Sequence, residues 1–162
     1  MKTYKVESFQ LDHTQVEAPY IRVADQKHFV QEGEVRSEFV VSKFDIRFTQ
    51  PNVEFLATAT IHSLEHLLAE NIRTYSDHVI DVSPMGCRTG FYVILQGAYT
   101  VEEVYELLTT TLRDVVEAKE VPACNEVQCG NYRDHDLEAA KKEAIRFLSH
   151  SKEFLQTFIR IT

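Results

Sequence analysis

Residues 42–50, SKFDIRFTQ, alternate between apolar and charged side chains. Successive side chains of a β-strand point to opposite faces, so one face of this segment would carry its apolar residues: Phe44, Ile46 and Phe48. The other face would carry Asp45 and Arg47. This alternation predicts a half-buried strand, with its apolar face toward the core and its charged face outward.

Two further segments have the composition of strands: 79–83 (VIDVS) and 91–97 (FYVILQG). The seven residues between them, PMGCRTG, contain the proline and glycines of a tight turn. Thr100 and Glu103 form a capping box that opens a helix, and residues 137–150 predict another, with a further helical segment toward the C-terminus. The sequence therefore predicts an α+β fold, with an antiparallel β-sheet covered by helices, in a single domain spanning residues 1–162.

Residues 61–68, IHSLEHLL, predict a helix that begins near residues 58–60 and ends near residue 75. Its leucines and isoleucines gather on one side, while His62, Glu65 and His66 fall on the adjoining arc. Imidazoles four residues apart face the same way and can chelate one divalent ion. The pattern H-x-x-E-H is also the inverted form of a metalloprotease motif. The competing interpretation is a helix with two surface histidines and a solvated glutamate.

A metal site needs at least one more protein ligand. The remote candidates are Cys87, Cys124, Cys129, His13, His78 and His135. Cys129 is favoured on local grounds, because Gly130 gives the backbone latitude to turn the thiolate inward. Two histidines and one cysteine would leave an open position, as in a catalytic site. Cys87, on the loop between two predicted strands, is either a reactive group or loop filler.

The composition is ordinary for a soluble globular protein, and we expect a cytoplasmic location. It has 162 residues, of which 44% are hydrophobic and 26% charged, and a net charge of −8. The acidic balance disfavours nucleic-acid backbones and anionic membranes as partners. We expect no secretory signal and no transmembrane helix. Three cysteines without framework spacing fit reduced thiols better than disulfides.

Seven segments, taken together and in order, resemble the S-ribosylhomocysteine lyase (LuxS) family. They are VESFQLDH (6–13), APY (18–20), KFDIRF (43–48), IHSLEHLLA (61–69), DVSPMGCRTGFY (81–92), VPACNEVQCG (121–130) and HDLEAAK (135–141). The resemblance covers almost the whole chain. The chain departs from the family at Cys124, an added thiol expected to be buried and structural, and at an insertion around residues 31–39.

The resemblance implies cleavage of S-ribosyl-L-homocysteine to L-homocysteine and 4,5-dihydroxy-2,3-pentanedione, the precursor of autoinducer-2. It implies a homodimer with active sites at the interface and one divalent metal ion per subunit, natively Fe²⁺ and replaceable by Zn²⁺ or Co²⁺. The residues implied are metal ligands His62, His66 and Cys129, proton-transferring Glu65 and Cys87, and substrate contacts Ser8, His13, Arg47 and the backbone near Asp81.

The residue types suit this chemistry. The thioether leaves only after the sugar carbonyl has migrated to a position that permits β-elimination, so protons must be removed beside a polarised oxygen. Two alternatives stay open. One is a metallopeptidase of the inverzincin type, in which Glu65 would activate water. The other is a non-catalytic module whose fold is stabilised by the metal, with Cys124 as the nearby candidate for a fourth metal ligand.

Overall fold

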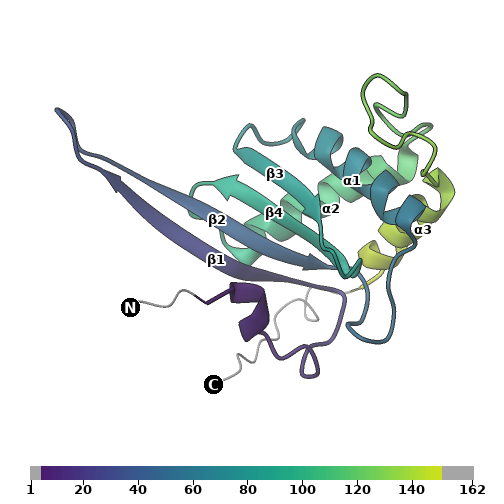
Figure 1. Cartoon of the computed structure of the whole chain (residues 1–162), viewed down its shortest axis with the longest axis horizontal. Helices are drawn as coiled ribbons and strands as arrows, with labels where there is room; N and C mark the ends of the chain where they lie inside the picture. The colour runs from purple at the N-terminus through teal and green to yellow at the C-terminus, as the bar shows by residue number, and fades with distance from the viewer. Residues whose placement is uncertain (1–4, 151–162) are drawn as a thin grey trace.

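The computed structural model describes residues 5–150, so the helical segment expected after residue 150 lies outside the described residues. Four antiparallel strands form one sheet in the order β1-β2-β4-β3 (Figure 1). The strands are β1 (Tyr20–Gln31), β2 (Ser37–Arg47), β3 (Val79–Pro84) and β4 (Gly90–Gln96). The helices are η1 (Glu7–Gln10, a 3₁₀ turn), α1 (Thr58–Ile72), α2 (Val101–Glu117) and α3 (Leu137–Leu148). The predicted α+β fold is confirmed.

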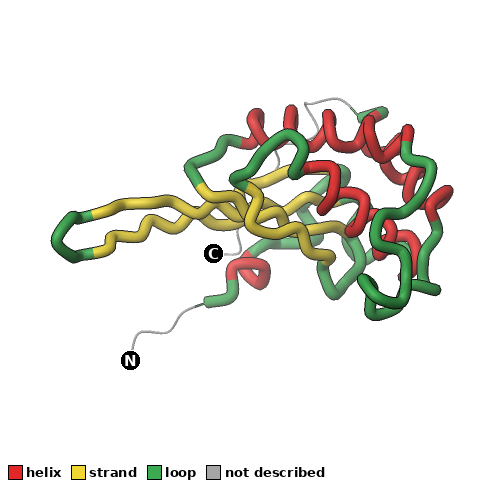
Figure 2. Tube along the Cα trace, turned by 90° about the horizontal axis from the view of Figure 1, so that it is seen from above, coloured by secondary structure: helices red, strands yellow, loops and turns green. Residues whose placement is uncertain are grey.

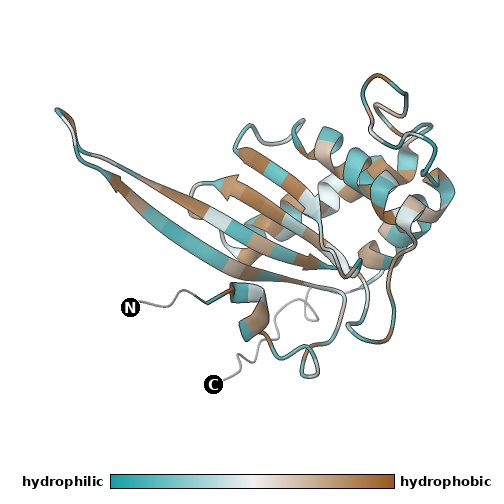
Figure 3. Cartoon of the chain, viewed as in Figure 1, coloured by the Kyte–Doolittle hydropathy of each residue, from teal (hydrophilic) through white to brown (hydrophobic). Residues whose placement is uncertain are grey.

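The strand predicted at residues 42–50 forms β2, which begins five residues earlier, at Ser37, and ends at Arg47. Hydrophobic and hydrophilic bands alternate along it, as predicted (Figure 3). Phe44 and Ile46 are fully buried in the core that the sheet shares with the helices. The prediction of a half-buried strand is wrong at this end, however. Asp45 and Arg47, on the face expected to point outward, are also buried, at 0% and 1% exposure. Both charged side chains are enclosed in a hydrogen-bonded cluster that includes the η1 segment.

The sequence analysis did not identify β1, which forms a long hairpin with β2. The pairing runs from Tyr20 opposite Arg47 to Gln31 opposite Ser37. The far half of this hairpin is exposed and projects beyond the rest of the molecule (Figure 2). Its stacked rings, Phe29 and Phe39, have centroids 5.0 Å apart across the two strands. Backbone pairing and cross-strand contacts hold this half together rather than burial against the helices.

Two of the described helices, α2 and α3, begin at residues whose side chains cap the first turn. The capping box of α2 is confirmed: Glu103 N donates to Thr100 Oγ1 at 3.2 Å, and Thr100 N donates to Glu103 Oε2 at 2.8 Å. At α3, Asp136 caps the first turn by accepting from Ala139 N at 2.9 Å. The apolar side of α1 is buried as expected, and the helix ends at Ile72 rather than near residue 75. Within residues 5–150, no helix combines the length and apolar character needed to span a membrane.

Candidate metal centre and active site

Four potential metal ligands meet beside α1. His62 and His66 lie on adjacent turns of that helix, while Cys129 and His135 come from the segment that precedes α3. The ligand atoms all lie within 4.8 Å of one another. Cys129 Sγ is 3.4 Å from His62 Nε2 and 3.7 Å from His135 Nε2. Of the six remote candidates, the structure thus brings Cys129 and His135 to the helical histidines.

The two helical imidazoles are held by backbone carbonyls. His62 Nδ1 donates to Asp134 O at 2.9 Å, and His66 Nδ1 donates to Pro122 O at 2.8 Å. A carbonyl oxygen can only accept, so each Nδ1 carries the proton of the neutral ring and each Nε2 keeps its lone pair. Metal-binding histidines are typically oriented in this way. Two such nitrogens and a cysteine sulfur fit a divalent transition metal, so the residues present suit the ion that the sequence resemblance implies.

His135 is packed into the same cluster. Its ring stacks on that of His62, with centroids 3.9 Å apart, and its Nδ1 lies 3.2 Å from Ser63 Oγ. Burial, followed by the neighbouring imidazoles of His62 and His66, lowers the pKa of His135. The lowered pKa favours the neutral form of the ring.

Glu65 lies beside the cluster but is not one of its members. It lines a groove of about 350 Å³ with His66, Ala69, Arg73 and Ala123, among others. The side chain is half-buried, and its carboxylate forms no hydrogen bond or ion pair with any other residue in the described range 5–150. A carboxylate with no structural partner beside a cation site is free to exchange protons with a group held in the groove.

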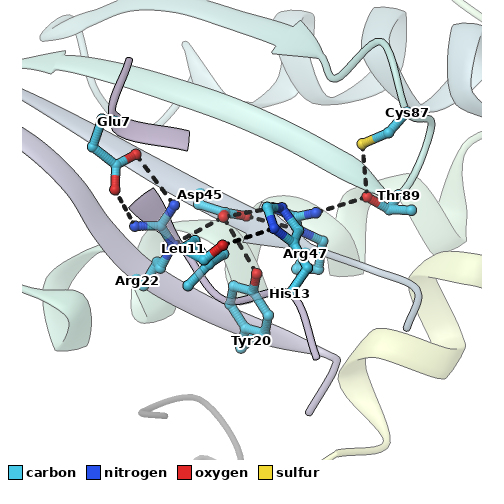
Figure 4. Close-up of polar contacts among 9 residues, drawn as sticks. All are labelled: Glu7, Leu11, His13, Tyr20, Arg22, Asp45, Arg47, Cys87 and Thr89. Carbon is cyan, nitrogen blue, oxygen red and sulfur yellow. Dashed lines mark hydrogen bonds and ion pairs between the residues drawn. The ribbon is translucent and has the colours of Figure 1, made fainter. Parts of the chain in front are cut away.

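A second polar cluster surrounds Arg47 at the end of β2 (Figure 4). Its guanidinium donates to both oxygens of Asp45, from Nε at 3.1 Å and from Nη2 at 2.7 Å. The remaining nitrogen, Nη1, donates to Thr89 Oγ1 at 2.9 Å, and that oxygen lies 3.0 Å from Cys87 Sγ. Burial disfavours the charge of Arg47, but the hydrogen bonds and negative charge of Asp45 outweigh it and raise the pKa. Arg47 thus keeps a positive charge near the Cys87 thiol.

Asp45 is the centre of this second cluster. Besides Arg47, it accepts from Arg22 Nε at 3.0 Å and from the Tyr20 hydroxyl at 3.3 Å. The far side of Arg22 donates to Glu7 at 2.5 and 3.2 Å, which attaches η1 to the sheet. The carboxylate therefore joins β1 to β2, and Arg22 extends that connection to η1.

The remaining predicted site residues lie on three elements. Ser8 is on η1, and its side chain hydrogen-bonds to Tyr92, whose pKa burial raises and this bond partly lowers. His13 follows η1, and its Nδ1 donates to Leu11 O at 2.9 Å (Figure 4). Cys87 is exposed on the turn between β3 and β4, as predicted. Asp81 is half-buried on β3 and accepts from the Ser83 hydroxyl.

The two clusters lie on different sides of the core. The apolar side of α1 packs into that core, whereas His62 and His66 turn toward residues 122–135. Arg47 alternates with the core residue Ile46 and therefore extends from the opposite face of β2. Over residues 5–150, no hydrogen bond or ion pair connects the metal-ligand cluster with the Arg47 cluster.

Comparison with known proteins gives the decisive observation. The model of the family S-ribosylhomocysteinase (LuxS) matches residues 6–158, which include both clusters. The chain belongs to the S-ribosylhomocysteinase (LuxS) family. S-ribosylhomocysteine lyase from Exiguobacterium sibiricum is 55% identical, over 95% of this chain and 96% of that protein. The proteins of the same name from Staphylococcus haemolyticus and Listeria monocytogenes are 49% and 48% identical, over 98% and 94% of this chain.

Within this LuxS chain, one expectation about the cysteines is wrong. Cys124 is exposed rather than buried, and its Sγ donates to Tyr132 O at 3.3 Å. It is not a member of the metal-ligand cluster. Sequence reasoning also missed Ser63, Thr89 and Asp45 as residues that contact the site, although each lies within a segment that carries the family resemblance. For Asp45 a signal existed, because it lies two residues from Arg47 on the same strand face.

Proposed function

We propose that the chain, acting as a single lyase domain, cleaves S-ribosyl-L-homocysteine to L-homocysteine and 4,5-dihydroxy-2,3-pentanedione. The observation that carries this proposal is the cluster of His62, His66 and Cys129 in a chain whose match to the LuxS family covers residues 6–158. The relatives named S-ribosylhomocysteine lyase align over nearly their whole length, which supports the same reaction here.

His62, His66 and Cys129 would hold one divalent ion per subunit, Fe²⁺ in the native enzyme, with Zn²⁺ or Co²⁺ able to replace it. When bound, such an ion supplies Lewis acidity that polarises a sugar oxygen and stabilises negative charge developing on it. The two carbonyl bonds to Asp134 and Pro122 support this assignment, because they aim both Nε2 lone pairs before any ion arrives. The mixed nitrogen and sulfur donors suit all three metals.

Glu65 would move protons between neighbouring carbons of the open sugar chain as its carbonyl migrates. Its place in the groove beside His66, without a structural partner in the described range, supports this role. Cys87 would act as the second proton carrier. Its thiol lies near the guanidinium of Arg47, because Thr89 Oγ1 accepts from Arg47 Nη1 and lies 3.0 Å from Cys87 Sγ.

Ser8, His13, Arg47 and the backbone near Asp81 would contact the substrate. Ser8 and His13 belong to the segment that covers the sheet face bearing Arg47, which supports a common binding surface. Arg47 is nearly fully buried and donates to Asp45 and Thr89, so it would act mainly through its fixed charge.

The separation of the two clusters supports a homodimer with active sites at the interface. The substrate must meet Cys87 and the metal ligands during one reaction, yet in one chain the core lies between Arg47 and the α1 histidines. A second copy that presents its Arg47 cluster to the first chain's metal cluster would complete the site. The three cysteines, all free, support a cytoplasmic location. The net charge of −8 supports a small-molecule substrate, with no nucleic-acid or membrane partner.

The test is thiol release. Protein loaded with Fe²⁺, Co²⁺ or Zn²⁺ is incubated with S-ribosylhomocysteine, and new free thiol is measured. We expect release that stops after prolonged chelation and returns when the metal is restored. Loaded protein that releases no thiol would overturn the proposal. Hydrolysis of a peptide library by the same sample would instead favour the inverzincin alternative, and binding of metal without either reaction would favour the structural module.

A further inference from the structure

The partners of Nδ1 divide the three clustered histidines into two kinds. His62 and His66 face carbonyl oxygens, which only accept, so their Nε2 atoms keep lone pairs. His135 Nδ1 instead faces the hydroxyl of Ser63 at 3.2 Å, a group that can donate or accept. The role of His135 therefore depends on where the hydroxyl proton of Ser63 goes.

A backbone donor decides the direction of that hydroxyl. Ser63 is fully buried, and its Oγ accepts from Asp136 N at 2.8 Å. In the described part of the chain, the other hydrogen-bond partner of Ser63 Oγ is His135 Nδ1. The buried Ser63 hydroxyl therefore has a hydrogen-bond acceptor only if its proton points at His135 Nδ1. Nδ1 of the neutral ring is then the acceptor, and the ring proton sits on Nε2, opposite to the arrangement in His62 and His66.

The protonated nitrogen of His135 faces sulfur. Its Nε2 lies 3.7 Å from Cys129 Sγ, and Asn131 N donates to the same sulfur at 3.4 Å. We propose that His135 is not a fourth metal ligand but a positioning residue, which donates from Nε2 to the Cys129 thiolate and leaves the fourth coordination position open. This inference rests on the metal-dependent function proposed above and adds His135 and Ser63 to its machinery.

A hydrogen bond from His135 would change how the Cys129 sulfur binds the metal. Hydrogen bonds to a coordinating thiolate fix its direction and reduce the electron density that it gives the metal, which leaves the ion a stronger Lewis acid. Replacement of such outer partners typically lowers metal affinity about 10- to 100-fold. An Nε2 ligand, by contrast, would close the site with four protein ligands, as in structural centres.

The experiment compares His135→Gln with His135→Phe in Co²⁺-loaded protein. The glutamine amide can still accept from Ser63 and donate to sulfur, whereas phenylalanine keeps a ring but can do neither. We expect the sulfur-to-cobalt charge-transfer band to move to longer wavelength in His135→Phe, with Zn²⁺ affinity lowered about 10- to 100-fold in chelator competition. In His135→Gln, the band and the affinity should stay near those of the unaltered protein. His28→Gln, an exposed change on β1, is the matched control.

Two outcomes would overturn the inference. If both variants change the cobalt d–d bands and lose affinity alike, His135 is a ligand. If neither variant changes the band or the affinity, His135 does not act on the sulfur. His135→Gln keeps the test valid should His135→Phe fold poorly, as monitored by circular dichroism. Because these readouts need no turnover, failure of thiol release would count against the proposed function and not against this inference.

Discussion

Replacing Asp45 with asparagine should strongly destabilise the protein. The carboxylate is 0% exposed and accepts from two buried guanidinium groups, those of Arg22 and Arg47. Asparagine has nearly the same volume but no charge, and its amide would place N–H groups against N–H groups. Arg22 would keep Glu7 as a counter-charge, whereas Arg47 would keep only the neutral Thr89.

The expected loss follows from the uncompensated buried charge. Removal of one partner from a buried ion pair costs about 3–5 kcal/mol. Small proteins are stable by only about 5–15 kcal/mol, so this is a large share of the total. The melting temperature should fall by roughly 6–20 °C, at about 2–4 °C for each kcal/mol in a chain of this size.

Urea unfolding followed by circular dichroism measures this loss. Asp77→Asn is the matched control, because the side chain of Asp77 is 99% exposed and its contact with His78 is 3.7 Å long. The control should stay within about 0.5 kcal/mol of the unaltered protein. A loss below about 1 kcal/mol for Asp45→Asn, comparable to that of the control, would refute the reasoning that this carboxylate holds the two arginines in place.

Three further predictions concern single side chains. Glu65→Gln should retain metal and lose about 10²-fold or more in turnover, measured as metal content and thiol release; near-normal turnover would reject its proton-transfer role. Cys129→Ala should lose metal, Cys87→Ala should keep metal but stop thiol release, and Cys124→Ala should keep both; an empty site in Cys124→Ala would contradict the ligand assignment. Burial raises the pKa of Glu143, so the folded state holds this proton up to a higher pH than the unfolded state does. The free energy of unfolding should therefore fall as the pH rises from the ordinary pKa of 4.5 through the raised pKa. Glu143→Gln should lack this loss in urea titrations at successive pH values, and an unchanged pH slope would argue against the raised pKa.

Much of the fold was predictable from local patterns. Alternation along β2 identified the face that enters the core, and the capping box located the start of α2. The exposed half of β1 has no buried face to produce alternation, so its pairing with β2 was not evident. Nor did the alternation indicate that the charged face of β2 would be buried, because that burial depends on Glu7 and its segment folding back onto the sheet.

In the candidate site, too, the local features were predictable from the sequence and the long-range contacts were not. The helical spacing of His62 and His66 is local, so their common face was predictable. Cys129 and His135 are more than sixty residues away, and Cys129 was favoured among the remote candidates only by the adjacent Gly130 and by the family resemblance. Ser63 gave no signal, since a serine on the buried side of a helix acquires a role only when the tertiary fold brings Asp136 and His135 to it.

The carbonyls that orient His62 and His66 have a consequence for sequence variation. Both hydrogen bonds end on the main chain, at Asp134 and Pro122, and not on their side chains. Every residue type carries the same carbonyl, so point substitutions in this segment preserve the acceptors as long as the chain keeps its path. An insertion or deletion between residues 122 and 134 would shift one carbonyl relative to the other. We therefore expect the length of this segment to be under tighter constraint than the identity of most of its residues.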